Sequence, residues 1–139
     1  MVPFGGWEMP LEYPTGTLAE HMACRSSAVV FDVSHLGTVQ LAGAGALDTL
    51  QGVLSNDLGK IAPGRAQYTH RLDEADGSVL DDIIVWWHPG EDGDVFDVMP
   101  NASNTERVRA AIGGRETTHE RAVLAVQGPR CDAVLDAVG

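Results

Sequence analysis

Two adjacent aspartates, Asp81 and Asp82, interrupt the most apolar β-type run of the chain, which extends over residues 79–87. Neighbouring residues of a strand point to opposite faces of a sheet, so these two carboxylates cannot form a catalytic dyad. An ionised carboxylate without a donor in an apolar layer is costly, or it takes up a proton. The sequence therefore predicts a strand in which each aspartate has its own hydrogen-bond donor.

Spacing alone leaves two interpretations of this pair open. In the structural one, one aspartate caps the turn at Gly77-Ser78 and the other pairs with an arginine. In the functional one, Asp82 lies on the same face as Trp86 and accepts N–H groups from a flat, nitrogen-rich ligand beside an aromatic wall.

Length and charge limit the class of protein further. The chain has 139 residues, enough for one compact unit with a modest core. Nine Lys and Arg against 20 Asp and Glu give a net charge of −11, so we expect neither nucleic acid nor a membrane as a partner. Only Cys24 and Cys131 are present, and no targeting segment is visible, so a cytoplasmic location is expected.

The pattern along the chain predicts an α+β fold in the order helix, strand, helix, three strands, helix, strand, helix. Residues 2–15 are expected to form an irregular arm, because glycines and prolines break any period. Two capping boxes are predicted, one from Thr17 and Glu20 and one from Ser103 and Glu106.

The predicted elements follow from local period and turn residues. Helices are expected at about 17–28, from Gly45 to Leu54, from Ser103 to the glycines at 113–114, and after Gly128-Pro129, with the proline at the first helical position. Strands or a hairpin are expected on both sides of residues 34–37, namely at 30–33 and 38–41. A hairpin at 66–72 and 79–87, a turn at 89–93, a strand at 95–99 and a short buried strand at 122–126 complete the prediction.

Other combinations of reactive side chains carry less weight. Ser34 and His35 are adjacent, so they would diverge on a strand, and no third orienting group is identifiable. His21 and Cys24 are three apart on a helix, but no second ligand pair follows at zinc spacing, so no metal site is predicted. The glycines at 43–45 lack the rest of a dinucleotide motif.

Several short segments together resemble the aminomethyltransferase family, the T-protein of the glycine cleavage system. Their order and spacing match across nearly the whole chain. The segments are Val2–Pro10 (VPFGGWEMP), Phe31–Gly37 (FDVSHLG), Ser55–Asp57 (SND), Pro63–Tyr68 (PGRAQY), Asp81–Val85 (DDIIV), Asn101–Asn104 (NASN) and Val126–Pro129 (VQGP).

The resemblance implies the N-terminal part of a multi-domain folate-binding fold, with mixed or antiparallel sheets and flanking helices. Residues 1–37 would start a discontinuous first folate-binding domain, residues 38–121 would form part of a second, and residues 122–139 would return to the first. Family members are much longer, so the chain resembles an N-terminal fragment.

The resemblance also implies an activity. In the family, an aminomethyl carbon passes from the lipoyl arm of the carrier H-protein to tetrahydrofolate, the co-substrate, with release of ammonia and without a metal. Asp82 matches the aspartate that contacts the pterin, and Leu36, Tyr68, Trp86 and Asn101 fall at positions that line the folate pocket. A partly desolvated carboxylate at Asp82 would favour the positive charge of the transfer. The implied partners are the lipoyl-carrying H-protein and a small-molecule folate.

Two site positions depart from the family's usual residues, and the shared architecture leaves alternative functions open. Leu36 stands where the family usually has Met, and Trp86 where it usually has Tyr. Two related classes share this architecture: folate-dependent demethylases, including the folate domains of proteins that oxidise dimethylglycine or sarcosine, and non-catalytic folate-binding proteins of iron–sulfur assembly.

Overall fold

The computed structural model describes residues 1–90 and 93–139, so residues 91–92 of the predicted turn at 89–93 lie outside the described residues. The chain forms two compact units. Unit 1 comprises Met1–His35 together with Arg121–Gly139, and unit 2 comprises Leu36–Glu120. The single compact unit expected from the length is therefore wrong, because the chain leaves the first unit and later returns to it.

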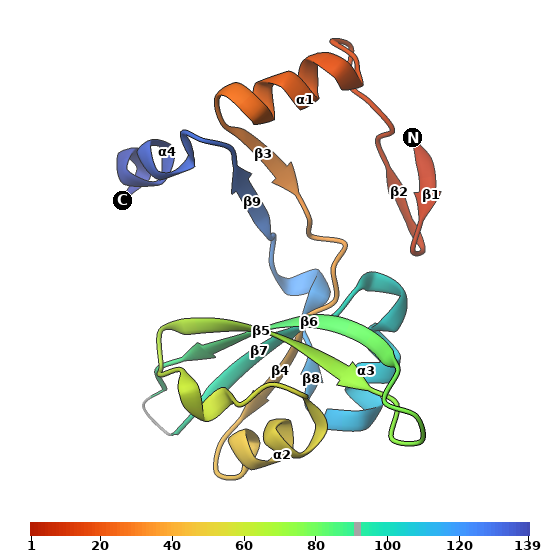
Figure 1. Cartoon of the computed structure of the whole chain (residues 1–139), viewed down its shortest axis with the longest axis vertical. Helices are drawn as coiled ribbons and strands as arrows, with labels where there is room; N and C mark the ends of the chain where they lie inside the picture. Colours follow the sequence, from red (N-terminus) through yellow and green to blue (C-terminus); the bar gives the residue numbers. More distant parts are fainter. Residues whose placement is uncertain (91–92) are drawn as a thin grey trace. The chain divides into compact units, whose positions relative to one another are not determined.

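Unit 2 is built on a five-stranded antiparallel sheet in the order β5-β6-β7-β4-β8 (Figure 1). The hairpin of β5 and β6 is the longest ladder, as the alternation of the sequence predicts. The strands are β4 (Val39–Ala42), β5 (Arg65–Leu72), β6 (Val79–His88), β7 (Val95–Met99) and β8 (Arg115–Glu116).

Two helices, α2 (Ala46–Val53) and α3 (Thr105–Ile112), cover one face of this sheet (Figure 1). Ile83 and Val85 of β6 are fully buried there, against Leu50 of α2 and Val108 of α3. Three short 3₁₀ turns complete the unit, at Leu58–Lys60, Ala102–Asn104 and Thr118–Glu120. The face of the sheet that the helices cover is thus the core face.

Unit 1 contains two separate two-stranded sheets and two helices. The strands β1 (Val2–Phe4) and β2 (Trp7–Met9) form a hairpin, and β3 (Val29–Asp32) pairs antiparallel with β9 (Leu124–Gln127). Neither α1 (Thr17–Ser26) nor α4 (Cys131–Val138) has a buried residue. The buried hydrophobic residues of the described chain all lie in unit 2. Unit 1 therefore has strands and helices but no comparable core.

The α+β class is confirmed, and most predicted elements are present. The irregular arm at 2–15 is wrong in part, because β1 and β2 form a hairpin around Gly5 and Gly6, both with positive φ (56° and 89°). Two glycines in that conformation allow the tight turn that pairs the strands. The alternative of a hairpin around residues 34–37 is also wrong, since β3 pairs with β9 while β4 pairs with β7 and β8.

The predicted helix caps differ from the observed ones. Both capping boxes are wrong, because the residues at the N-caps of α1 and α3 are Gly16 and Asn104. Glu20 instead accepts a hydrogen bond from the backbone N–H of Tyr13, at 2.7 Å. The strand β9 is not buried, and Pro129 precedes the N-cap of α4 rather than opening the helix. Within the described residues, no helix combines the length and apolar content that crossing a membrane requires.

Candidate functional site

The strand β6 carries Asp81 and Asp82 to opposite faces of the sheet, as predicted. Asp81 lies on the core face beside Ile83 and is only 4% exposed, whereas Asp82 points to the opposite face and is exposed. The two carboxylates therefore meet different environments, although they are adjacent in the chain.

Asp81 is held by amide donors from the segment after β7. Its Oδ1 accepts from Asn101 Nδ2 at 2.7 Å and from Asn104 Nδ2 at 3.0 Å, and its Oδ2 accepts from the backbone N–H of Asn101 at 3.3 Å. β7 pairs with β6 and ends at Met99, so the chain turns beside the two aspartates. A buried carboxylate with three N–H donors is satisfied without a cation.

Asp82 is held from two sides on the opposite face. The Tyr68 hydroxyl donates a short hydrogen bond to Asp82 Oδ2, and Asn101 Nδ2 donates to Asp82 Oδ1 at 2.8 Å. Tyr68 lies on β5 directly opposite Ile84, so its hydroxyl reaches Asp82 along the diagonal of the ladder. These donors, Tyr68 first and then Asn101, lower the pKa of Asp82 below its ordinary value, and the same bond raises the pKa of Tyr68. Asp82 is thus kept ionised.

The structural interpretation of the aspartate pair is wrong. The turn before β6 is capped by other residues, since Asp76 accepts from the backbone N–H of Ser78 at 2.9 Å. Arg71 stands opposite Asp81 in the register, yet neither aspartate belongs to an ion pair within residues 1–90 and 93–139. The expectation of separate donors holds only in part, because one amide group, Asn101 Nδ2, serves both carboxylates.

The structure brings together three of the five residues expected in the site, namely Tyr68, Asp82 and Asn101. Trp86 is half-buried on the same face as Asp82, but it lies four positions further along the strand, a Cα spacing of about 13 Å. Leu36 is half-buried at the start of unit 2. The desolvation expected at Asp82 is not provided by unit 2, because its carboxylate points away from the helices that cover the core face.

Asn104 is the residue of this cluster that sequence reasoning missed. It follows Asn101 by three residues, at the start of α3, and the spacing of two amides in one tight turn is the signal that could have found it. Its Nδ2 donates only to the Asp81 side of the cluster, to Asp81 Oδ1 and, at 3.5 Å, to the backbone oxygen of Leu80.

A second polar group on the same sheet face contains His88 and Asp97. Asp97 is 3% exposed and lies opposite Trp86 in the register of β6 and β7. Its Oδ2 is 2.9 Å from His88 Nε2, and its Oδ1 accepts from Gln40 Nε2 at 3.2 Å.

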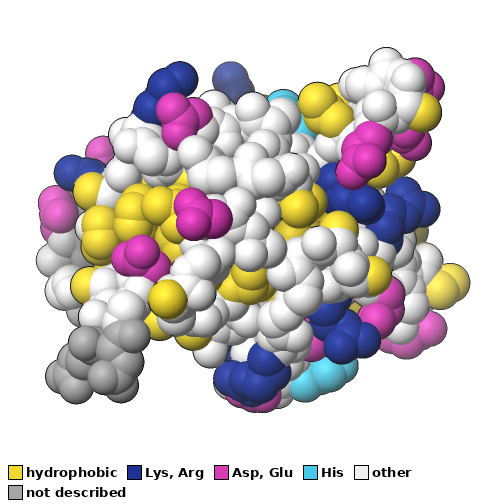
Figure 2. Space-filling model, turned by 90° about the horizontal axis from the view of Figure 1, so that it is seen from below, with side chains coloured by type: hydrophobic (Ala, Val, Ile, Leu, Met, Phe, Trp, Pro, Cys, Tyr) yellow, Lys and Arg dark blue, Asp and Glu magenta, His cyan; other side chains and the backbone are white. Residues whose placement is uncertain are grey.

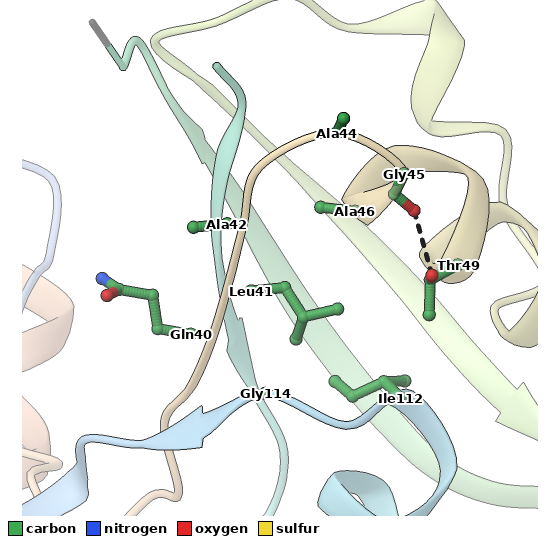
Figure 3. Close-up of a pocket in the computed structure, with 9 residues that line it drawn as sticks. All are labelled: Gln40, Leu41, Ala42, Ala44, Gly45, Ala46, Thr49, Ile112 and Gly114. Carbon is green, nitrogen blue, oxygen red and sulfur yellow. Dashed lines mark hydrogen bonds between the residues drawn. The ribbon is translucent and has the colours of Figure 1, made fainter. Parts of the chain in front are cut away.

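A pocket of about 290 Å³ lies at the end of β4 and the start of α2 (Figure 3). Leu41 and Ile112 lie on its apolar side, and the Thr49 hydroxyl donates to the backbone oxygen of Gly45 at 2.9 Å. The pocket contains none of the predicted site residues, and its lining is mostly of small or apolar side chains.

The remaining motifs have structural contacts. The Ser34 hydroxyl oxygen accepts from the backbone N–H of Val123 at 2.9 Å, and the rings of His35 and Phe4 pack in a T-shaped arrangement with their centroids 5.7 Å apart. In the described part of the chain, no three His, Cys, Asp or Glu side chains are grouped so that they could hold a metal ion. On the face shown in Figure 2, acidic and basic side chains are interspersed, with hydrophobic ones between them.

Comparison with known proteins gives a consistent result. The family description "GCVT N-terminal domain" matches residues 1–139. The chain is 45% identical to the aminomethyltransferase of Frankia alni, covering 100% of this chain and 40% of that protein. It is 46% identical to the aminomethyltransferase of Mycobacterium tuberculosis, covering 98% of this chain and 38% of the relative.

A solved structure shares the fold. The crystal structure of the glycine cleavage system aminomethyltransferase T from Bartonella henselae matches with a TM-score of 0.79 and 32% identity, over 99% of this chain and 39% of that one. The chain therefore spans about two fifths of the length of these relatives.

Proposed function

We propose a function on the premise that this chain belongs to the aminomethyltransferase family of the glycine cleavage system and matches its N-terminal part. In this proposal, the chain provides the carboxylate for aminomethyl transfer. The reaction moves an aminomethyl carbon from the lipoyl arm of a carrier H-protein to tetrahydrofolate and releases ammonia. The observation that carries the proposal is the exposed Asp82 carboxylate held by Tyr68 and Asn101.

The hydrogen-bonding capacity of this cluster fits a ligand edge rich in N–H groups. Tyr68 donates its single hydroxyl hydrogen to Asp82, and both Nδ2 hydrogens of Asn101 are directed at carboxylates. The groups left for a ligand are therefore acceptors: the remaining lone pairs of Asp82 and Tyr68, and Asn101 Oδ1. The N–H groups of a reduced pterin are donors of the kind that such a cluster binds.

The lowered pKa of Asp82 indicates how it would act. An efficient general base has a pKa near the working pH, whereas Tyr68 and Asn101 keep the Asp82 carboxylate ionised well below neutrality. Positive charge develops on the transferred carbon as its bond to sulfur breaks and its bond to nitrogen forms. We therefore assign Asp82 an orienting and electrostatic role, in which its negative charge stabilises that positive charge.

Trp86 and Leu36 complete the proposal as apolar walls. Trp86 lies about 13 Å from Asp82 along the same face, with Ile84 between them, so the face is long enough for an extended ligand. We likewise propose that one folate-binding domain includes residues 1–37 and 122–139, and that another includes residues 38–121. The cytoplasmic location remains a prediction.

Binding to the chain itself provides the first test. Calorimetric titration with tetrahydrofolate should give a measurable affinity that Asp82→Ala abolishes. The matched control Asp76→Asn changes an exposed turn aspartate and should bind as the parent does. Equal affinity of the Asp82→Ala chain would contradict the proposed site.

Transfer is tested by exchange into a full-length relative. This chain would replace the corresponding N-terminal part of the Frankia alni aminomethyltransferase, and release of ammonia from the loaded H-protein would be followed. Asp82→Ala should lower the transfer rate by about 10²–10³-fold, the usual effect of removing one preorganised electrostatic group. Near-parental turnover of a folded variant would exclude the role assigned to Asp82.

A further inference from the structure

We infer that Asp81, the buried aspartate that faces away from the proposed substrate, is a positioning residue that fixes the side-chain amide of Asn101. Asp81 accepts one Nδ2 hydrogen of Asn101, which leaves the other Nδ2 hydrogen directed at Asp82. Only the oxygen of the Asn101 amide is then offered to a ligand. The consequence for the ligand rests on the proposed function, whereas the orientation of the amide does not.

Asp81 is joined to Asn101 by two hydrogen bonds. Asp81 Oδ1 accepts from the Asn101 side chain at 2.7 Å, and Asp81 Oδ2 accepts from the Asn101 backbone N–H at 3.3 Å. A carboxylate that holds both the backbone and the side chain of one residue restricts its position and its rotamer. Asn104 Nδ2 adds a third N–H donor, to the same Asp81 Oδ1, at 3.0 Å.

The carboxylate of Asp81 matters because its three hydrogen-bond partners are all N–H donors. Asp81 is 4% exposed and has no cation within hydrogen-bonding distance in the described residues, so these N–H donors are the groups that satisfy its buried oxygens. A carboxylate is acceptor-only, whereas an asparagine at this position would also present N–H groups. Of these two side chains, only the carboxylate requires Asn101 to turn Nδ2, rather than Oδ1, toward position 81.

The amide orientation in turn controls Asp82. If the Asn101 amide were reversed, its oxygen would face Asp82 Oδ1 across the 2.8 Å now spanned by a hydrogen bond. Asp82 would lose a donor and gain a repulsive neighbour, which raises its pKa. The other groups beside Asp82 are Tyr68 and His70, which stands opposite it on β5, and neither contacts Asp81 through a hydrogen bond.

The test is a carboxyl titration by NMR on the full 139-residue chain. In Asp81→Asn, which keeps the size of the side chain, loss of the neighbouring negative charge would by itself lower the Asp82 pKa. A reversed Asn101 amide acts in the opposite direction, and we expect it to dominate, so that the Asp82 pKa rises above the value measured in the parent chain. Asp76→Asn serves as the control, because it removes an equal charge from an exposed turn and should leave Asp82 unchanged. An unchanged Asp82 pKa in a folded Asp81→Asn chain would overturn the inference.

A reciprocal exchange separates positioning from stability. The double variant Asp81→Asn with Asn101→Asp keeps one amide and one carboxylate in contact, but it places a carboxylate beside Asp82. We expect its stability to recover relative to Asp81→Asn while the Asp82 pKa rises further. Recovery of both quantities together would show that Asp81 has a structural role only, and would overturn the inference.

The parent chain provides a measurement that needs no substitution. The two Nδ2 protons of Asn101 should have distinct chemical shifts and exchange slowly with water, since each is bonded to a carboxylate. Exchange of both protons at the rate of an exposed amide would overturn the inference even if the variants failed to fold. Absence of folate binding would instead count against the proposed function and leave these titrations interpretable.

Discussion

Gly37 lies close against Thr105 in unit 2, and adding one methyl group there should be costly. A Cβ atom at Gly37 would lie 2.0 Å from Thr105 Oγ1, 2.7 Å from Thr105 Cγ2 and 2.8 Å from Thr105 Cβ. Real Cβ atoms essentially never make contacts this short, so Thr105 or the backbone must move. The φ angle of Gly37 lies outside the left-handed region, so the effect of alanine is steric.

The expected cost follows from the surroundings of Thr105. This residue begins α3 and is 8% exposed, and its hydroxyl donates to the backbone oxygen of Ala102 at 3.1 Å. Overpacking of a buried site costs about 1–3 kcal/mol, and loss of the hydroxyl bond adds about 1 kcal/mol. We therefore expect Gly37→Ala to lower the free energy of unfolding by about 2–4 kcal/mol.

Urea unfolding followed by tryptophan fluorescence measures this change, because Trp86 and Trp87 both lie in unit 2. With a slope of about 1–3 kcal/mol per M, the midpoint should fall by about 0.7–4 M. The double variant Gly37→Ala with Thr105→Ala removes the two shortest contacts, so it should be more stable than the sum of the single effects predicts. Strict additivity, or a parental midpoint for Gly37→Ala, would refute the steric reasoning.

Three further predictions concern other parts of the chain. Tyr68→Phe removes the main cause of the lowered Asp82 pKa, so that pKa should rise toward 3.8. A carboxyl pKa that is lower in the folded than in the unfolded state stabilises the fold at higher pH, and this stabilisation is lost as the pH falls. In urea titrations, unit 2 of the variant should therefore lose less stability than the parent between pH 5 and pH 3. Leu50→Ala, at a fully buried position of α2, should cost about 2–5 kcal/mol in the same assay, and a cost near zero would contradict the core described above. Hydrogen exchange should be slowest in β6 and β7 and fast in α1 and α4, which have no buried residue, and equal protection would contradict the assignment of the core to unit 2.

Much of the candidate site could be predicted because it depends on one strand and on short motifs. The alternation along residues 79–87 was enough to place Asp81 and Asp82 on opposite faces, and the family resemblance pointed to Asp82, Tyr68 and Asn101. The sharing of Asn101 between both carboxylates could not be predicted, since it depends on where the turn after β7 lies against β6. The exposure of Asp82 was missed for a related reason: a strand pattern indicates two faces but not which of them the helices cover.

The sequence by itself determined the local structure of this protein: the long hairpin of β5 and β6, the helix between the glycine at 45 and the polar stop at 55–57, and the turn that ends α3 at Gly113. Local period and turn residues act within a few positions, so they can be read in order along the chain. Only the tertiary structure decided that β3 pairs with β9, that β4 lies between β7 and β8, and that two asparagines satisfy a buried carboxylate. These arrangements are contacts between distant segments, and their free energy depends on burial and hydrogen-bond partners that no single segment contains.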